Sequence, residues 1–376
     1  MTPSDQENKN ASVAFAGGSA HGGDIWGAAR RLKRPLNEIL DLSASLNPLG
    51  PPPGLAEEMA GCLGLLCHYP DRHTVELNQA LAEACGLEPG NVLPGNGSTA
   101  LIRLVARALD LKTILLLAPT FGDFARALAL AGRHFHHFFL KEENNFAPTM
   151  ADVEDLWQQE PSCLILGNPL SPSGGLVDSS VLEAILAQAE RRRAWVVLDE
   201  AFIDFAPAPA QGWAPAKVLA NPRFIVLRSL TKFYCLAGLR LGYLLAHQDT
   251  AAELRLLGEP WSVNTLAQKA GPYCLAQKQY AEKTREVVSL WRKAQAERLA
   301  ELGLFVFPSQ ANYLLVRLPA EGPTAAQVAK ACAQQGVLLR DCASFNGCAP
   351  YHLRIAVASL EEQERLFSVL TPALKA

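Results

Sequence analysis

A lysine in a position to do chemistry stands just beyond an apolar run in this chain. Residues 224–227 predict a buried strand, and Ser229, Thr231 and Lys232 follow it. Parallel sheets bind their ligands at the carboxyl ends of strands, where partial burial lowers the pKa of a lysine and favours imine formation. The two hydroxyl groups suit a phosphate, and Arg240 offers a planar fork to phosphate oxygens. Alone, such a lysine is most often an ordinary surface residue.

Two further polar residues follow apolar runs in the same way. Asp199 comes after residues 194–198, and Asn168 comes after residues 163–166. A carboxylate at a strand end can pair with a protonated pyridine nitrogen, and an amide can donate to a phenolate oxygen. Each residue also has an ordinary explanation, because an aspartate can cap a helix and Asn-Pro is a common turn.

A glycine-containing turn precedes the helix predicted over residues 98–111. Gly97, Ser98 and Thr99 open this helix, whose backbone amides can bind a phosphate that small residues allow to approach. The nucleoside-triphosphate loop is excluded because its Gly-Lys-Ser/Thr ending is absent. Phe121 follows the next apolar run and can either stack on an aromatic cofactor or fill the core.

A sheet is needed to place these residues together. Apolar runs alternate with helical patterns, which predicts right-handed crossovers and a mostly parallel sheet covered on both faces. The runs span residues 113–118, 135–140, 163–166, 194–198, 224–227 and 242–246. The large part of the chain is therefore predicted to have an α/β fold.

The pattern changes near residue 260, where a long helical stretch over residues 267–302 begins. We expect it to break early at Gly271-Pro272, and the shorter strands and helices after it indicate an α+β domain. Residues 47–53 are proline-rich and predict a rigid, extended connector. The predicted domains are an N-terminal arm (1–46) that joins the small domain, a large cofactor-binding domain (47–262) and a small C-terminal domain (263–376).

Composition narrows the class of protein. The chain has 376 residues, 49% of them apolar and 19% charged, with a net charge of -3 spread along its length, which argues against a nucleic-acid partner. No apolar stretch reaches the roughly 20 residues of a membrane helix, and residues 1–10 lack the apolar core of a signal peptide, so we expect a cytoplasmic protein.

No metal site is expected. The nine cysteines are scattered and predict buried free thiols. Cys342 and Cys348 have the wrong spacing for a zinc knuckle. His134 and His136 would share one face of a strand while His137 takes the other, and no nearby partner has metal-site spacing.

The order of these residues resembles that of the fold-type I pyridoxal-5′-phosphate (PLP) enzymes of the aspartate aminotransferase superfamily, from about residue 40 to the end. The matching motifs are Asn-Pro-x-x-Pro-x-Gly from Asn168, Asp-Glu-Ala from Asp199, and Ser-x-Thr-Lys with Gly-Leu-Arg-x-Gly. The resemblance implies that Lys232 carries PLP as a Schiff base, with Asp199 at the pyridine nitrogen, Asn168 at the ring hydroxyl and Phe121 on the ring face. It also implies a homodimer in which the cofactor phosphate is held by Gly97, Ser98, Thr99, Ser229, Thr231, Arg240 and, from the neighbouring subunit, Tyr69.

Within the superfamily, the chain is similar to a branch of histidinol-phosphate aminotransferases and L-threonine-O-3-phosphate decarboxylases. The opening His-Gly-Gly-Asp from His21, the late pair Arg340 and Arg354, and Phe202 in place of the usual tyrosine favour the decarboxylases. Asp24 and Ser45 stand where the decarboxylases usually carry asparagines.

The reaction implied by this resemblance is PLP-dependent decarboxylation of L-threonine O-3-phosphate, giving (R)-1-aminopropan-2-yl phosphate and CO2 for the cobamide linker. We expect the substrate phosphate to occupy a pocket formed by two arginines, which leaves the carboxylate free to turn out of the cofactor plane. The expected substrate-binding residues are His21, Gly22, Asn47, Asn168, Arg340 and Arg354.

Three alternatives stay open. A histidinol-phosphate aminotransferase would share most of the same motifs. A decarboxylase of O-phospho-L-serine differs by one substrate methyl, which is worth only about 1–3 kcal/mol of discrimination. A PLP-binding regulator is disfavoured because no helix-turn-helix precedes the matched region.

Overall fold

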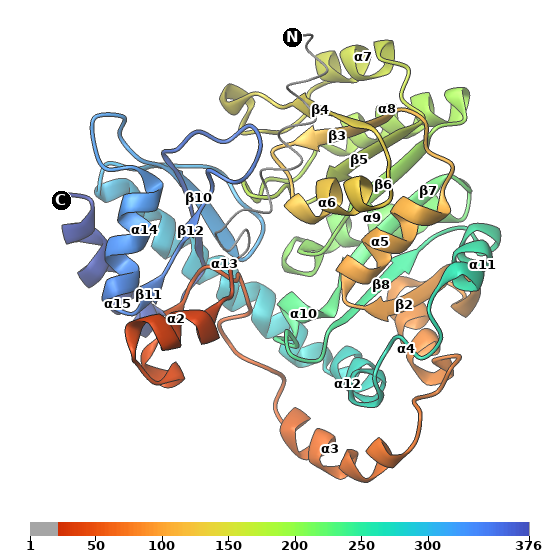
Figure 1. Cartoon of the computed structure of the whole chain (residues 1–376), viewed down its shortest axis with the longest axis horizontal. Coiled ribbons are helices and arrows are strands. Elements are labelled where there is room, and N and C mark those ends of the chain that lie inside the picture. The colour runs from red at the N-terminus through yellow and green to blue at the C-terminus, as the bar shows by residue number, and fades with distance from the viewer. Residues whose placement is uncertain (1–21, 376) are drawn as a thin grey trace.

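A seven-stranded sheet forms the centre of the larger lobe in the computed structural model, which describes residues 22–375 (Figure 1). The five strands β4-β3-β5-β6-β7 run parallel, and β8 is antiparallel to both β7 and β2. The strand order is β2 (Val92–Asn96), β8 (Leu241–Leu245), β7 (Phe224–Ser229), β6 (Trp195–Asp199), β5 (Cys163–Gly167), β3 (Ile114–Ala118) and β4 (Phe135–Phe139). The α/β fold with a mostly parallel sheet is confirmed.

Burial on both faces explains why the strands are continuously apolar. Leu115 and Leu117 pack into the core on one face, whereas Ile114 and Leu116 pack into the core on the other. One core is covered by α4 (Val75–Cys85), α7 (Met150–Gln158), α8 (Ser179–Arg192), α9 (Ala208–Val218) and α12 (Thr265–Ala276). The other is covered by α5 (Ser98–Ala108), α6 (Gly122–Leu130) and α11 (Gln248–Leu257).

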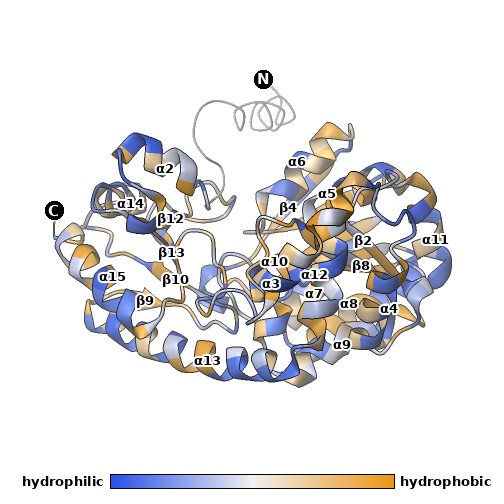
Figure 2. Ribbon diagram, turned by 90° about the horizontal axis from the view of Figure 1, so that it is seen from below, coloured by the Kyte–Doolittle hydropathy of each residue, from blue (hydrophilic) through white to orange (hydrophobic). Residues whose placement is uncertain are grey.

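A smaller lobe holds an antiparallel sheet with a core of its own. Figure 2 shows α13 (Lys278–Glu301) running along both lobes. The sheet order is β12 (Arg340–Asp341), β13 (His352–Ala356), β10 (Tyr313–Arg317) and β9 (Phe305–Val306). The helices α14 (Ala325–Gln334) and α15 (Leu360–Ala373) contribute to the core of this lobe.

The N-terminal segment reaches the smaller lobe before the chain enters the larger one. β1 (Leu40–Asp41) pairs in parallel with β11 (Val337–Leu338), and α2 (Ile25–Leu32) precedes it. The exact limits of the three domains stay a prediction.

Two local expectations were wrong. The helix α12 continues through Pro272 and ends at Ala276, because its apolar side is held against α3 (Leu55–Gly61) and α4, so the loss of one backbone donor does not break it. Residues 47–53 are not simply extended. Asn47 folds a turn there, with its carbonyl accepting from Gly50 N at 3.0 Å and its side chain accepting from Leu49 N at 3.0 Å.

Among the helices of residues 22–375, none combines the length and hydrophobicity that crossing a bilayer requires.

Candidate active site

The ends of three adjacent strands bring the predicted polar residues together. Asn168 follows β5, Asp199 ends β6 and Ser229 ends β7, and the register places Gly167 opposite Asp199 and Asp199 opposite Leu227. The backbone N–H of Asn168 donates to the carbonyl of Asp199 at 2.8 Å. The edge of the sheet therefore fixes these side chains through backbone pairing rather than through flexible loops.

Lys232 lies on α10 (Leu230–Phe233), the single turn that follows β7. Its Nζ donates to the carbonyl of Ala44 at 3.3 Å and lies 5.8 Å from the centroid of the Phe202 ring. Burial, and to a smaller extent the nearby charges of Arg354 and Arg240, lower the pKa of Lys232 to about 8. A neutral amine is the form that attacks a carbonyl, so this environment suits imine formation.

The lowered pKa of Lys232 predicts how the cofactor-free protein takes up PLP. With a pKa of about 8, the neutral amine fraction rises about tenfold per unit up to pH 8 and then levels off. The second-order rate of imine formation should follow that curve. Stopped-flow absorbance of the imine band between pH 6 and pH 10 measures it, and a rate that still climbs steeply up to pH 10 would contradict the lowered pKa.

Asp199 and Asn168 each keep one polar atom available. Asp199 accepts a hydrogen bond from Ala201 N at 3.0 Å, and burial raises the pKa of its carboxyl group to about 6. A protonated ring nitrogen beside this carboxylate would lower that pKa again, because an opposite charge favours the ionised form. Asn168 Oδ1 accepts from Val177 N at 3.0 Å, which orients its Nδ2 as the donor.

Small residues form a cradle at the start of α5. Gly97 has φ +72°, and a Cβ at this position would lie 2.6 Å from Arg240 Nη2. A Cβ at Gly242 would lie 2.5 Å from Ser98 N. Ser229 Oγ and Thr231 Oγ1 share a hydrogen bond of 2.6 Å at the neighbouring strand end. Backbone amides at a helix N-terminus and a guanidinium in one cradle are the donors that a phosphate needs.

Replacing Gly97 with alanine should weaken PLP binding by about tenfold or more. The methyl group would displace Arg240 from the cradle, in addition to straining a left-handed residue. Equilibrium dialysis of PLP measures the effect. Gly132→Ala is the matched control, because Gly132 has φ +68° with open space around its Cβ. Equal losses of PLP affinity in both variants would show that backbone strain alone is responsible.

Arg340 and Arg354 lie directly opposite each other on β12 and β13. Arg354 is 9% exposed, and its hydrogen bonds are long, at 3.3 Å from Nη2 to the carbonyl of Ser43 and 3.5 Å from Nη1 to Ser171 Oγ. Its Nε has no hydrogen-bond partner within residues 22–375. Lys232 donates to the carbonyl of Ala44, and Arg354 donates to the carbonyl of Ser43. The segment 43–44 therefore lies beside both side chains.

The N-terminal arm approaches the same place. Gly22 packs so closely on the Ser43 carbonyl that a Cβ would collide with it, and Gly23 N donates to Ser43 Oγ at 2.9 Å. Asp24 caps α2 by accepting from Gly27 N at 2.9 Å, a role that asparagine also fills. His21 lies outside the described residues.

Asn47 has a structural role in this state of the protein. Its Nδ2 donates to the carbonyl of Phe233 at 2.7 Å and contacts Tyr280 and Thr284 at 2.8 and 3.2 Å. Its backbone N–H donates to the carbonyl of Lys232 at 3.1 Å. Asn47 therefore fixes the chain around Lys232, and a direct substrate contact through its amide would replace these bonds.

Three further residues were predicted to bind the cofactor. Thr99 Oγ1 donates to Asp123 Oδ2 at 3.3 Å, and Phe121 is half-buried at the start of α6. Tyr69 is 81% exposed, with its ring centroid 5.0 Å from that of Trp261. Tyr69 thus points to the outside of its own chain.

Two aromatic side chains at the site were not anticipated. Tyr313 is fully buried, with its ring centroid 4.9 Å from Arg354 Cζ and its hydroxyl donating to the carbonyl of Leu170 at 2.9 Å. Phe345 lies beside both arginines. In the sequence, each looks like an ordinary core residue of the small domain, and only the cross-strand register reveals their position.

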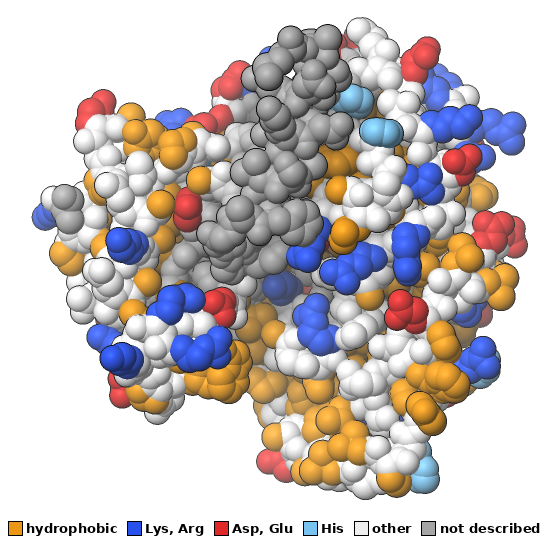
Figure 3. Space-filling view, viewed as in Figure 1, with side chains coloured by type: hydrophobic (Ala, Val, Ile, Leu, Met, Phe, Trp, Pro, Cys, Tyr) orange, Lys and Arg blue, Asp and Glu red, His pale blue; other side chains and the backbone are white. Residues whose placement is uncertain are grey.

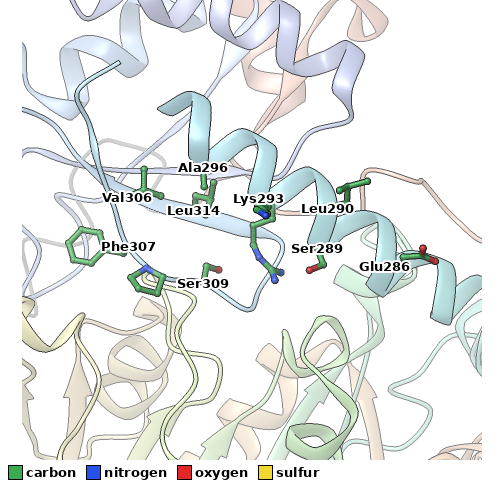
Figure 4. Close-up of a pocket in the computed structure, with 11 residues that line it drawn as sticks. Glu286, Ser289, Leu290, Lys293, Ala296, Val306, Phe307, Ser309 and Leu314 are labelled. Carbon is green, nitrogen blue, oxygen red and sulfur yellow. The ribbon is translucent and has the colours of Figure 1, made fainter. Parts of the chain in front are cut away.

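A separate cavity of about 620 Å³ lies between α13 and the β9–β10 hairpin (Figure 4). Its walls include Lys293, Val306, Phe307 and Ser309, and none of the predicted site residues lines it. The strand-end site around Lys232 is therefore distinct from this cavity.

Comparison with known proteins shows the family to which the chain belongs. The model of the family Aminotransferase class I and II matches residues 37–367. This chain belongs to that family. It is 36% identical to a threonine-phosphate decarboxylase of Salmonella typhimurium, over 95% of this chain and 97% of that protein. It is 32% identical to a histidinol-phosphate aminotransferase of an Anaeromyxobacter species, over 89% of this chain and 91% of that protein.

The fold is shared with a protein of known structure. A histidinol-phosphate aminotransferase of Sinorhizobium meliloti, solved in complex with PLP, superposes with a TM-score of 0.83 at 22% identity and covers 93% of this chain and 94% of its own. The residues at the strand ends fit the same cofactor. They supply a buried amine of lowered pKa, a buried carboxylate and a phosphate cradle that leaves no room for a Cβ.

Proposed function

We propose that this protein is a PLP-dependent decarboxylase of L-threonine O-3-phosphate, releasing CO2 and (R)-1-aminopropan-2-yl phosphate for cobalamin biosynthesis. The observation that carries the proposal is the buried guanidinium group of Arg354, which donates to the carbonyl of Ser43 beside the Ala44 carbonyl that Lys232 contacts, with the buried Arg340 opposite it on the neighbouring strand. A phosphate is the substrate group that two arginines bind best. The similarity to a threonine-phosphate decarboxylase over nearly the whole chain supports it.

Residues of this chain would have separate roles around the cofactor. When bound, PLP supplies a ring that accepts the electron pair left on the substrate Cα. Asp199 would hold the positive charge of the ring nitrogen, and Asn168 Nδ2 would donate to the ring oxygen. Arg340, Arg354 and the arm would hold the substrate phosphate, which leaves the substrate carboxylate without an arginine partner. Lys232 Nζ, in its protonated form, would return a proton to Cα after CO2 has left.

A product assay tests this proposal against its alternatives. Purified protein with PLP and O-phospho-L-threonine should release CO2 and an equal amount of aminopropanol phosphate. A parallel reaction with O-phospho-L-serine sets the substrate preference. If CO2 is absent and a keto product forms from histidinol phosphate with 2-oxoglutarate, the protein is an aminotransferase.

We also propose that the working form is a homodimer. Figure 3 shows apolar side chains gathered over α3 and the segment after it, at the lower edge of that view. Leu63, Leu66 and Tyr69 are 54%, 57% and 81% exposed there, and monomers rarely leave such a patch open. Tyr69 is placed on the outside of its own chain, where it could reach a neighbour's phosphate cradle. Sedimentation of the PLP-loaded protein should give the mass of two chains.

A further inference from the structure

Tyr313 lies beside the guanidinium of Arg354 on the small sheet. The register of β10 and β13 places Leu315 opposite Arg354, so Tyr313, two residues earlier, is a diagonal neighbour of Arg354 on the same face. The Tyr313 ring centroid is 4.9 Å from Arg354 Cζ, nearer than that of Phe345 at 5.8 Å. The hydrogen bonds of Arg354 are long, at 3.3 and 3.5 Å, and orient its guanidinium only weakly. The Tyr313 ring adds to this orientation without taking up an N–H donor.

The hydroxyl of Tyr313 holds a loop of the large lobe. It donates to the carbonyl of Leu170 at 2.9 Å, and the side chain is fully buried. The same carbonyl accepts from Gly174 N at 2.6 Å, and Leu170 N donates to the carbonyl of Gly175 at 2.8 Å, so residues 170–175 form a closed turn. A Cβ at Gly174 would lie 3.2 Å from Tyr313 Cε2, so this turn packs directly on the ring. A phenylalanine would fill the same space, and the bond to Leu170 is what offsets the burial of a hydroxyl here.

The loop that Tyr313 holds belongs to the candidate site. It follows directly on Asn168, the predicted donor to the cofactor ring oxygen. On its other side, the Tyr313 ring meets the ring of Phe202 edge to face, with centroids 4.9 Å apart. Phe202 in turn lies 5.8 Å from Lys232 Nζ. Tyr313 therefore contacts the arginine of the small lobe and also the residues of the large lobe that surround the predicted cofactor.

We propose that Tyr313 is a positioning residue for the substrate phosphate, whose ring sets the plane of the Arg354 guanidinium and whose hydroxyl fixes that plane relative to the loop after Asn168. The inference rests on the proposed function, because it takes Arg354 as a group that binds the substrate phosphate. A guanidinium binds a phosphate with two parallel hydrogen bonds only when its plane faces the phosphate oxygens, so its orientation decides the affinity. Tyr313 acts through Arg354 and not by contact with the substrate.

The test measures phosphate binding to the PLP-loaded protein, in which the cofactor already fills its own phosphate cradle. Isothermal titration calorimetry with inorganic phosphate compares wild type, Tyr313→Phe and Tyr313→Leu. Loss of the hydroxyl alone in Tyr313→Phe should weaken phosphate binding by about threefold to tenfold. Loss of the ring as well in Tyr313→Leu should weaken it by about tenfold to a hundredfold. In turnover, KM for O-phospho-L-threonine should rise by similar factors, while kcat changes by less than about twofold.

A second substitution separates positioning from a general structural role. If Tyr313 acts through Arg354, adding Tyr313→Phe to an Arg354→Ala protein should lower kcat/KM by less than about twofold further, because residues that act as a unit are not additive. A tyrosine that only stabilises the fold would cause the same loss in both backgrounds. The phenylalanine variant keeps the packing of the ring, so it decides the test whether or not the leucine variant folds.

Tyr273→Phe is the matched control, because its hydroxyl also donates to a backbone carbonyl, that of Pro53, at 2.7 Å and outside the site. It should bind phosphate as wild type does. The proposal is overturned if wild type binds no phosphate, if Tyr313→Phe binds phosphate as tightly as wild type, or if its loss persists in full beside Arg354→Ala. Phosphate binding does not depend on turnover, so a wild type that binds phosphate through Tyr313 and Arg354 without releasing CO2 would refute the decarboxylase alone.

Discussion

Lys232→Ala should release CO2 from O-phospho-L-threonine at least about 10⁴-fold more slowly than wild type, because one substitution removes both the cofactor attachment and the proton donor for Cα. Nζ is the amine that the strand end presents, at 3.3 Å from the carbonyl of Ala44. The purified variant should also lack the imine absorbance band after PLP is added. Trapped CO2 and the absorbance spectrum measure the two effects independently.

Lys217→Ala serves as the control for this substitution. Lys217 pairs with Glu183 at 2.5 Å on the outside of the large lobe, so its loss should leave the rate within about twofold of wild type. A Lys232→Ala protein that keeps the imine band would mean that a different lysine carries the cofactor. One that loses the band but decarboxylates within about tenfold of wild type would remove Lys232 from the chemistry.

The strand-end residues could be predicted because their signal is local. Asp199 and Asn168 each follow a run of apolar residues that is buried on both faces, and a parallel sheet brings such ends to one edge. The β8 strand was found by the same signal, but its antiparallel direction was not, because direction depends on the connection through Gly238–Arg240 rather than on composition. Backbone conformation at Arg240, with φ +59°, is part of that reversal.

Contacts between residues that only long-range strand pairing brings together could not be predicted from the sequence. Tyr313 and Ser43 reach Arg354 because β10 and the arm lie beside β13, and no spacing in the sequence records that. The motif predicts that Asn47 binds the substrate, which stays a prediction, and in the structure its amide contacts Phe233 and Tyr280. Sequence motifs predict which residues lie around Lys232. The hydrogen bonds in the structure show which of these side chains are already bonded within the protein.

Arg354→Ala should raise KM for O-phospho-L-threonine and lower kcat/KM by about 10²–10³-fold, while PLP binding changes little. A bidentate contact between a guanidinium and a phosphate contributes about 3–4 kcal/mol through two charge-assisted hydrogen bonds. The present partners of Arg354 are weak, with distances of 3.3 and 3.5 Å, so little protein structure should be lost with it. Steady-state kinetics and equilibrium dialysis of PLP separate the two effects.

Arg354→Lys and Arg317→Ala complete the test. Lysine keeps the charge without the planar fork, so it should recover only part of the loss. Arg317 lies on the same sheet and pairs with Glu142 away from the site, so its removal should leave KM unchanged. Unchanged kinetics in Arg354→Ala would eliminate the arginine pocket. A variant that loses decarboxylation but gains keto product would show that Arg354 also determines which bond to Cα is cleaved, in addition to binding the substrate.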